Sequence, residues 1–156
     1  MVIQARTSSL EIDAIDCTIL RLLGVEGRMP MTELGRRIGM SSPSVTERVR
    51  RLEESGIIQG YQAQIDPPAL GLAISAYIRV RPMPGKLDHV ACLLRETAAV
   101  IECDRVTGDD CFIARVHVGS IQEIEEVIDL IIPFATTHTS IVQSTPVPRR
   151  LPQLPR

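Results

Sequence analysis

The spacing of apolar residues changes near residue 57 of this 156-residue chain, and that change constrains the fold more than any other feature of the sequence. Before it, apolar residues recur three or four positions apart, which predicts short amphipathic helices over residues 10–23 and 32–38, and a third that starts at Ser41 or Ser42. After it, stretches of strict alternation predict half-buried strands between further helices. We therefore expect an α+β protein with a helical first third.

The flanking residues predict where these three helices begin and end. Gly24 and Gly27 are expected to end the first helix, Thr32 to cap the second and Gly39 to end it. Ser42, with a proline directly after it, is typical of the cap of the third helix, which Gly56 is expected to stop. The second and third helices are then separated only by the short turn GMS.

Arginine is concentrated on the third helix although the whole chain has a net charge of −2. Residues 28–51 hold six arginines against two glutamates, whereas residues 67–148 hold six basic and ten acidic side chains. A helix-turn-helix with a basic outer face can enter the major groove of DNA, where Arg reads guanine or clamps phosphate. The spacing therefore favours DNA as a partner of the first third.

The position of each side chain around the third helix assigns expected roles. The residues expected near bases are Ser44, Glu47, Arg50 and Arg51, and those expected near phosphates are Arg36, Arg37 and Arg48. Ser42 and Thr46 complete the predicted DNA-binding set. A plainer alternative is a solvated helix in which Arg50 and Arg51 pair with Glu54 and Glu47. The stretch GIIQGYQAQID, expected as a strand after the third helix, favours the DNA-binding interpretation.

In the rest of the chain, alternation and helical spacing predict a repeating order of elements. The expected strands are residues 74–81, 100–107, 111–118 and 138–145, and the expected helices are residues 86–98 and 120–132. This order is the ferredoxin-like βαββαβ arrangement. With both helices on one face of the sheet, the other face is left to be covered by a second copy or by a ligand.

Several ordered segments together resemble the Lrp/AsnC (leucine-responsive/asparagine-regulator) family of transcription regulators over about residues 10–148. They are IDAIDCTILRLL, TELGRRIGMSSPSVTERVRRLEESGIIQGYQAQIDPPALG, VTGDDCF and TSIVQS. The resemblance implies a winged helix-turn-helix over residues 1–56, a strand-like linker over 57–71 and a ferredoxin-like ligand-sensing and oligomerisation domain over 72–148. The proline-rich basic tail, residues 149–156, is expected to be mobile. Gly35 stands where the family usually has alanine, which suggests closer helix packing.

The resemblance also implies an effector site and an assembly. Effectors of the family bind near the turn between the second and third strands of the sensing domain and near its last strand, and homodimers assemble further, commonly into octamers. The corresponding residues here are Thr107, Gly108, Asp109, Asp110, Cys111, Thr139 and Ser140. A carboxylate here can pair with the ammonium of an amino acid, while hydroxyls and amides bind its carboxylate. Many members have Asp in place of Cys111. The alternative for residues 108–110, GDD, is a hairpin turn without a ligand.

Other classes of function have weaker support in the sequence. The four cysteines show no paired metal spacing and the three histidines are scattered, so we expect neither a metal nor another cofactor. No apolar run approaches the ~18 residues of a membrane span, and the first residues lack the apolar core of a secretory signal, so the cytoplasm is expected. Sirohaem decarboxylases look like this family and remain the enzymatic alternative. A metal- or redox-sensing winged helix is a third.

Overall fold

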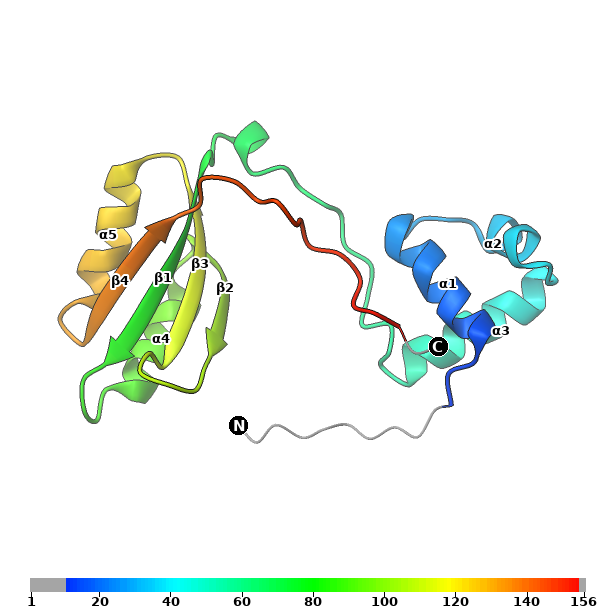
Figure 1. Cartoon of the computed structure of the whole chain (residues 1–156), viewed down its shortest axis with the longest axis horizontal. Coiled ribbons are helices and arrows are strands. Elements are labelled where there is room, and N and C mark those ends of the chain that lie inside the picture. The colour runs from blue at the N-terminus through cyan, green and yellow to red at the C-terminus, as the bar shows by residue number, and fades with distance from the viewer. Residues whose placement is uncertain (1–10, 155–156) are drawn as a thin grey trace. The chain divides into compact units, whose positions relative to one another are not determined.

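The computed structural model describes residues 11–154, which fold into two units (Figure 1). One unit holds residues up to Gln64 together with residues from Pro148 onward, and the other holds Ile65–Val147. The C-terminal tail, which we expected to be mobile, thus lies with the helical unit over its described residues, 149–154. No helix in the described range is both long and apolar enough to cross a membrane.

The helical unit contains α1 (Ala14–Val25), α2 (Met31–Ile38) and α3 (Ser42–Glu54). Most of its core comes from the apolar stripes that the helical spacing predicted, and Met29, between α1 and α2, was not predicted. The buried residues of this core are Ile19, Leu23, Met29, Leu34, Val45, Val49 and Leu52. Burying each large aliphatic side chain contributes about 1.5–3 kcal/mol, so packing of these stripes, rather than helix propensity, holds the three short helices together.

Two predicted helix caps and one predicted helix end were wrong, although α3 begins at Ser42, one of its two predicted starts. Thr32 does not cap α2, because the helix already begins at Met31 after Pro30, which has extended backbone and offers no side-chain cap. Ser41, not Ser42, caps α3, and its hydroxyl accepts from the backbone N–H of Ser44 at 3.4 Å. Gly24 does not end α1 but lies inside it, one residue before its last. Gly39 does end α2, with φ of 72°.

Gly35 allows the turn between α2 and α3 to fold down onto α2. A Cβ at this position would lie 2.6 Å from the carbonyl oxygen of Met40. The backbone N–H of Met40 donates to the carbonyl of Gly35 at 2.9 Å, which fixes this close approach. The glycine therefore permits a close approach of the turn that follows α2, while closer packing of a neighbouring helix stays a prediction.

The strand expected directly after α3 is absent: within the described range, residues 57–66 run as irregular chain. A short 3₁₀ turn, Pro68–Leu70, follows, and Gly71 ends it with φ of 83°. An alternating stretch becomes a strand only when a neighbouring strand takes up its backbone hydrogen bonds. The sheet of this chain is built without it, so the strand expected from this stretch does not form within the chain, and the strand-like linker implied by the resemblance stays a prediction.

The second unit is the ferredoxin-like sandwich that the order of elements predicted. Its elements are β1 (Ile74–Pro82), α4 (Leu87–Glu96), β2 (Val100–Arg105), β3 (Phe112–Val118), α5 (Ile121–Ile131) and β4 (Ala135–Ile141). The strands pair antiparallel in the order β2-β3-β1-β4. The last strand begins three residues earlier than expected, because Ala135 already pairs with Pro82.

Both helices pack against the same face of this sheet. Residues Ala76, Ile78 and Val80 of β1 are fully buried beneath them, as the alternation predicted. The opposite face, here called the open face, carries Tyr77 and Arg79, both exposed. The described structure thus has a complete hydrophobic layer on one side of the sheet and a polar layer on the other.

Ile78→Ala should lower the free energy of unfolding of the sheet unit by about 2–5 kcal/mol, because it leaves a cavity under a fully buried side chain. Chemical denaturation followed by circular dichroism measures the change. Ile101→Ala, at a site that is 55% exposed, is the control and should change it by less than about 1 kcal/mol. Equal losses in the two variants would contradict the one-sided core.

Candidate nucleic-acid interface and effector site

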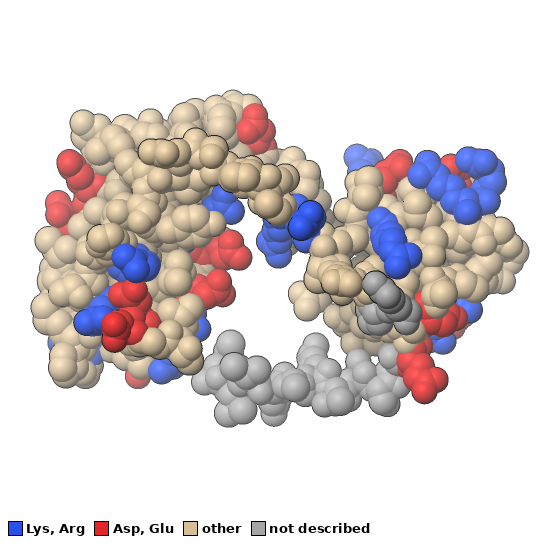
Figure 2. Space-filling view, viewed as in Figure 1, with Lys and Arg blue, Asp and Glu red and all other residues tan. Residues whose placement is uncertain are grey.

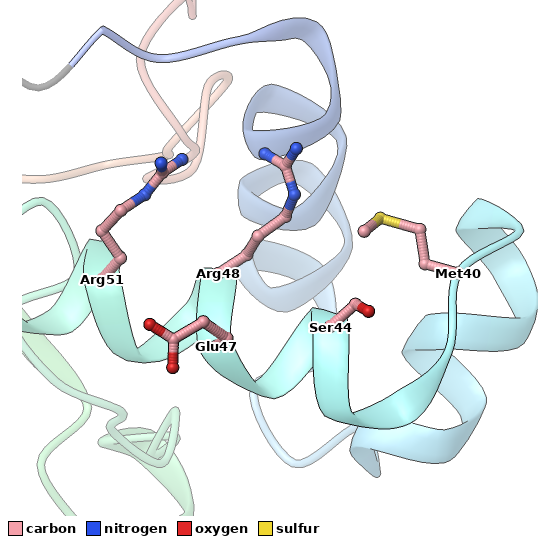
Figure 3. A pocket seen from close by; sticks show the side chains of 5 residues that line it. All are labelled: Met40, Ser44, Glu47, Arg48 and Arg51. Atoms are coloured by element: carbon pink, nitrogen blue, oxygen red, sulfur yellow. The ribbon is translucent and has the colours of Figure 1, made fainter.

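A shallow hollow lies on the surface of α3, next to the turn that precedes this helix. Met40, Ser44, Glu47, Arg48 and Arg51 line this hollow. Figure 3 shows Arg48 and Arg51 projecting from the same side of α3, one turn apart, with Glu47 on the adjoining side. Four of the residues predicted to bind DNA are therefore brought together on one surface.

The two arginines of the hollow are anchored by a buried carboxylate on α1. Asp16 is 0% exposed, and its two oxygens accept from Arg48 Nη1 at 2.8 Å and from Arg51 Nη2 at 2.9 Å. Arg48 Nη1 also donates to Asp13 at 2.7 Å. The guanidinium of Arg48 and the backbone N–H of Asp16 together hold the pKa of Asp13 below its ordinary value, the backbone bond having the larger effect.

The same two aspartates form the cap of α1. The side chain of Asp13 accepts from the backbone N–H of Asp16, and the side chain of Asp16 accepts from the backbone N–H of Asp13. This reciprocal capping box satisfies two amide groups that a helix start leaves without partners. Asp13 and Asp16 thus fix both the start of α1 and the positions of Arg48 and Arg51 on α3.

The remaining arginines of the predicted set pair with carboxylates at the surface. Arg36 and Arg37 both contact Glu33, at 2.8 and 2.7 Å. Arg50 contacts Glu47 and Glu54 from the neighbouring turns of α3. Figure 2 shows basic side chains gathered with acidic ones at the edge of the helical unit. The alternative of a salt-bridged face is therefore correct for Arg50, whereas Arg51 pairs with α1 instead of Glu47.

These surface pairs leave their arginines available to other partners. The pKa of Glu33 falls to about 2 because Arg36 and then Arg37 donate to its carboxylate, and the pKa of Glu47 is lowered by Arg50. Exposed ion pairs nevertheless contribute only about 0–1 kcal/mol, because water and salt screen them. A phosphate can therefore replace these carboxylates at little cost.

The hydroxyl groups near the start of α3 are occupied within the helix. Thr46 donates to the carbonyl of Ser42 at 2.9 Å, and the hydroxyls of Ser41 and Ser44 lie 2.8 Å apart. Ser42 is half-buried, while Ser44 and Thr46 are exposed. Of the three hydroxyls predicted near DNA, those of Ser44 and Thr46 therefore face solvent.

The predicted effector turn is tied to the end of β1. Arg81 Nε donates to the carbonyl of Asp109 at 2.6 Å, and its Nη2 lies 3.6 Å from the carboxylate of the same residue. Arg79 Nη1 lies 3.7 Å from the carboxylate of Asp110. Sequence reasoning missed both arginines as members of this site, although the alternation of β1 had already placed them together on the open face.

The backbone of this turn is held on both sides. Cys111 donates its N–H to the carbonyl of Val80 at 3.0 Å, and its carbonyl accepts from the N–H of Val106. Gly108 has φ of 108°, a conformation that other residues rarely adopt. Thr107 and Asp109 next to it are exposed. The hairpin alternative therefore describes the geometry of GDD, and its carboxylates also face two cations.

Thr139 and Ser140 do not belong to one surface. Thr139 lies opposite Ile78 in the strand register, on the side covered by the helices, whereas Ser140 lies opposite Tyr77 on the open face. The hydroxyl of Thr139 is buried and has no hydrogen-bond partner among the described residues. Only Ser140 shares the open face with Arg79. His138, which lies opposite Arg79, was not predicted and is exposed on that face.

Among the described residues, no three His, Cys, Asp or Glu side chains are grouped so that they could hold a metal ion. The charged groups that the described fold does bring together are therefore those on α3 and around the GDD turn.

Comparison with known proteins matches both units. The AsnC-type helix-turn-helix domain matches residues 12–53, and the Lrp/AsnC ligand binding domain matches residues 75–152. The HTH-type transcriptional regulator LrpC of Bacillus subtilis is 33% identical over 135 residues, which cover 86% of this chain and 94% of that protein. The chain belongs to the Lrp/AsnC family.

Solved structures of other Lrp/AsnC proteins have the same fold. The structure of B. subtilis LrpC superposes with a TM-score of 0.85 at 31% identity, covering 90% of this chain and 100% of that one. The feast or famine regulatory protein of Mycobacterium tuberculosis, solved in complex with L-methionine, superposes with a TM-score of 0.83 at 33% identity and covers 90% and 97%. This Lrp/AsnC chain therefore shares the architecture of proteins named as regulators.

Asp16→Asn should lower the free energy of unfolding of the helical unit by about 1–3 kcal/mol, because it removes the charge that compensates two arginines at a buried position. Thermal and denaturant unfolding measure the loss. Glu54→Gln, which breaks an exposed pair with Arg50, is the control and should cost less than about 1 kcal/mol. A loss no larger than that of the control would contradict the anchoring role of Asp16.

The ion pairs of Glu33 should depend on pH in a defined direction. Its folded pKa of about 2 lies below the ordinary 4.5, so its contribution to stability is complete above about pH 4.5 and is lost as the pH falls toward 2. Glu33→Gln should accordingly lower the melting temperature at pH 6 and have a progressively smaller effect toward pH 2. An effect that is unchanged over this range would mean that Glu33 is not held ionised by Arg36 and Arg37.

Proposed function

We propose that this Lrp/AsnC protein is a sequence-specific DNA-binding transcriptional regulator whose DNA affinity or assembly responds to a small molecule, an amino acid being the class expected. The observation that carries the proposal is the arrangement on α3: two arginines anchored by the buried Asp16 lie beside exposed arginines that can change partners. The names of its relatives support the same function.

In this proposal the arginines have two different roles. Arg48 and Arg51 lose little freedom on binding, because Asp16 already holds them over the hollow. Arg36 and Arg37 exchange surface carboxylates for phosphates, whereas Arg50 exchanges its carboxylates for a base edge. Ser44 and Glu47 reach base edges from the first turns of α3. A homodimer would present two such helices to half-sites about one helical turn apart.

The open face and the GDD turn support the proposed effector site. Arg79 and Arg81 can bind the carboxylate of an amino acid in place of Asp109 and Asp110, which can in turn bind its ammonium group. The similar M. tuberculosis regulator was solved with L-methionine. Thr107, Gly108, Cys111 and Ser140 remain in the proposed set, whereas Thr139 would need a site on the helix side of β4. Assembly beyond the dimer, up to an octamer, and a cytoplasmic location belong to the proposal.

An enzyme on the same scaffold, similar to sirohaem decarboxylases, is the competing proposal. The relatives reported above are named as regulators, which favours DNA binding. An absorbance band on addition of sirohaem to the purified protein would support the enzyme, and its absence at micromolar protein would count against it.

The decisive experiment is a titration of the protein against the DNA upstream of its own coding sequence, at two salt concentrations, with and without a pool of the twenty amino acids. We expect specific binding that weakens with salt and shifts in the presence of the pool. Specific binding without a shift would keep the regulator and remove the amino-acid effector. No specific binding to this region or to a library of genomic fragments would contradict the proposal.

Two substitutions separate the proposed roles. Arg51→Ala should weaken specific binding by about 1–3 kcal/mol with little effect on non-specific binding, because a residue near bases contributes to discrimination. Arg36→Ala should weaken both and reduce the steepness of the salt dependence by about one charge. Arg95→Ala on α4 is a charge-matched control in the other unit and should leave both unchanged. The same effect from Arg51→Ala and Arg36→Ala would contradict the division of roles.

A further inference from the structure

Gly24 is a glycine that the backbone of α1 does not require. It lies inside the helix, where alanine has the higher propensity. Its surroundings explain the missing side chain: Leu151 of the C-terminal tail lies over it, with Cδ1 2.2 Å from the position that a Cβ at residue 24 would occupy. The tail therefore contacts bare backbone on α1, which a larger residue at this position would push away.

A second glycine three residues further on receives another side chain. The ring of Tyr61 lies 3.4 Å from the position of a Cβ at Gly27, an ordinary van der Waals distance that is looser than the contact at Gly24. The hydroxyl of Tyr61 donates to Glu53 of α3 at 2.9 Å, and partial burial together with this carboxylate raises the pKa of Tyr61 to about 12. We call Gly24 and Gly27 the glycine seat. The side chain of Leu151, from the tail, contacts Gly24, and the ring of Tyr61, from the segment that follows α3, contacts Gly27.

The tail has the chemistry of a segment that docks at low entropic cost. Residues 148–154 read PRRLPQL, and prolines at both ends of PRRLP favour an extended conformation before any contact is made. Leu154 is half-buried although it stands close to the end of the described chain. Because β4 ends at Ile141, only residues 142–147 connect the sheet to the docked segment.

We propose that the glycine seat is a docking surface for the chain's own C-terminal tail, which forms a strap from β4 back to the helix-turn-helix. The two units are then joined by the chain twice, at residues 64–65 and again at residues 147–148, instead of once. A second connection restricts the movement of the helical unit relative to the sheet, because both connecting segments must span between the units at the same time. A displacement of the end of β4 is then transmitted to α1 through residues 142–147.

The strap also changes the charge of the helical unit. Residues 11–64 contain seven arginines and eight carboxylates, and the docked tail adds Arg149 and Arg150. The formal side-chain charge of residues 11–64 is −1 by themselves and +1 together with the docked residues 148–154. A docked tail therefore favours the approach of a polyanion, and a released tail removes that contribution.

Limited digestion of the full chain with trypsin tests the proposal, because the enzyme cleaves after Arg149 and Arg150. Leu151→Ser removes the apolar contact, and Gly24→Gln fills the seat with a good helix former that preserves α1. We expect both variants to lose the C-terminal peptide about tenfold faster than the parent protein, followed by mass spectrometry, since a docked segment must open before it is cut. Their melting temperatures should not fall.

The controls are Val147→Ser, a similar change before the docked segment at a side chain that is 62% exposed, against 44% for Leu151, and Val25→Ala, next to the seat but 90% exposed. Both should be cleaved at the parent rate. Cleavage of Leu151→Ser and Gly24→Gln at the rate of the controls would overturn the proposal. Protection that increases with protein concentration would also overturn it, because the tail would then dock on a neighbouring copy. The assay contains no DNA, so its outcome is independent of the proposed regulation.

Discussion

The buried carboxylate of Asp16 is the constraint on which the helical unit depends. A charge removed from water is costly unless several donors compensate it, and here two guanidinium groups and a backbone amide do so. The donors come from α3 and from the N-cap residue of α1, so the compensation is possible only when the two helices are correctly docked. The interaction that stabilises the fold therefore also sets the positions of Arg48 and Arg51.

The arginines of the helical unit fall into two groups, those paired with the buried Asp16 and those paired with exposed glutamates. Near Asp16 the arginines are held by a carboxylate that cannot leave the core, whereas Arg36 and Arg50 are held by glutamates that water can replace. The buried ion pairs of Asp16 and the exposed ion pairs of Arg36 and Arg50 therefore have different effects on DNA binding. The first kind fixes geometry before a partner arrives, and the second provides charge that can be transferred to a phosphate with little loss.

The sheet unit separates its two faces in a similar way. Its helix side is a continuous apolar core, while the open face carries Arg79, Arg115 and Tyr77, with the guanidinium of Arg115 5.6 Å above the ring of Tyr77. Arg115 Nε and the hydroxyl of Ser75 are buried without hydrogen-bond partners among the described residues. A face with such groups is suited to gain polar contacts from a second copy or a ligand.

The sequence by itself determined the three helices, the order βαββαβ and the faces of β1, because these depend on the local period of apolar residues. It also brought together most of the residues on α3, because neighbours on one helix face follow from spacing alone. It could not identify Asp16 as the partner of Arg48 and Arg51, 32 and 35 residues away, or Leu151 as the cover of Gly24. Nor could it separate Thr139 from Ser140, whose faces are set by the register with β1. Only the tertiary structure decided these points, because contacts between distant segments depend on how whole elements pack and not on the period within any one of them.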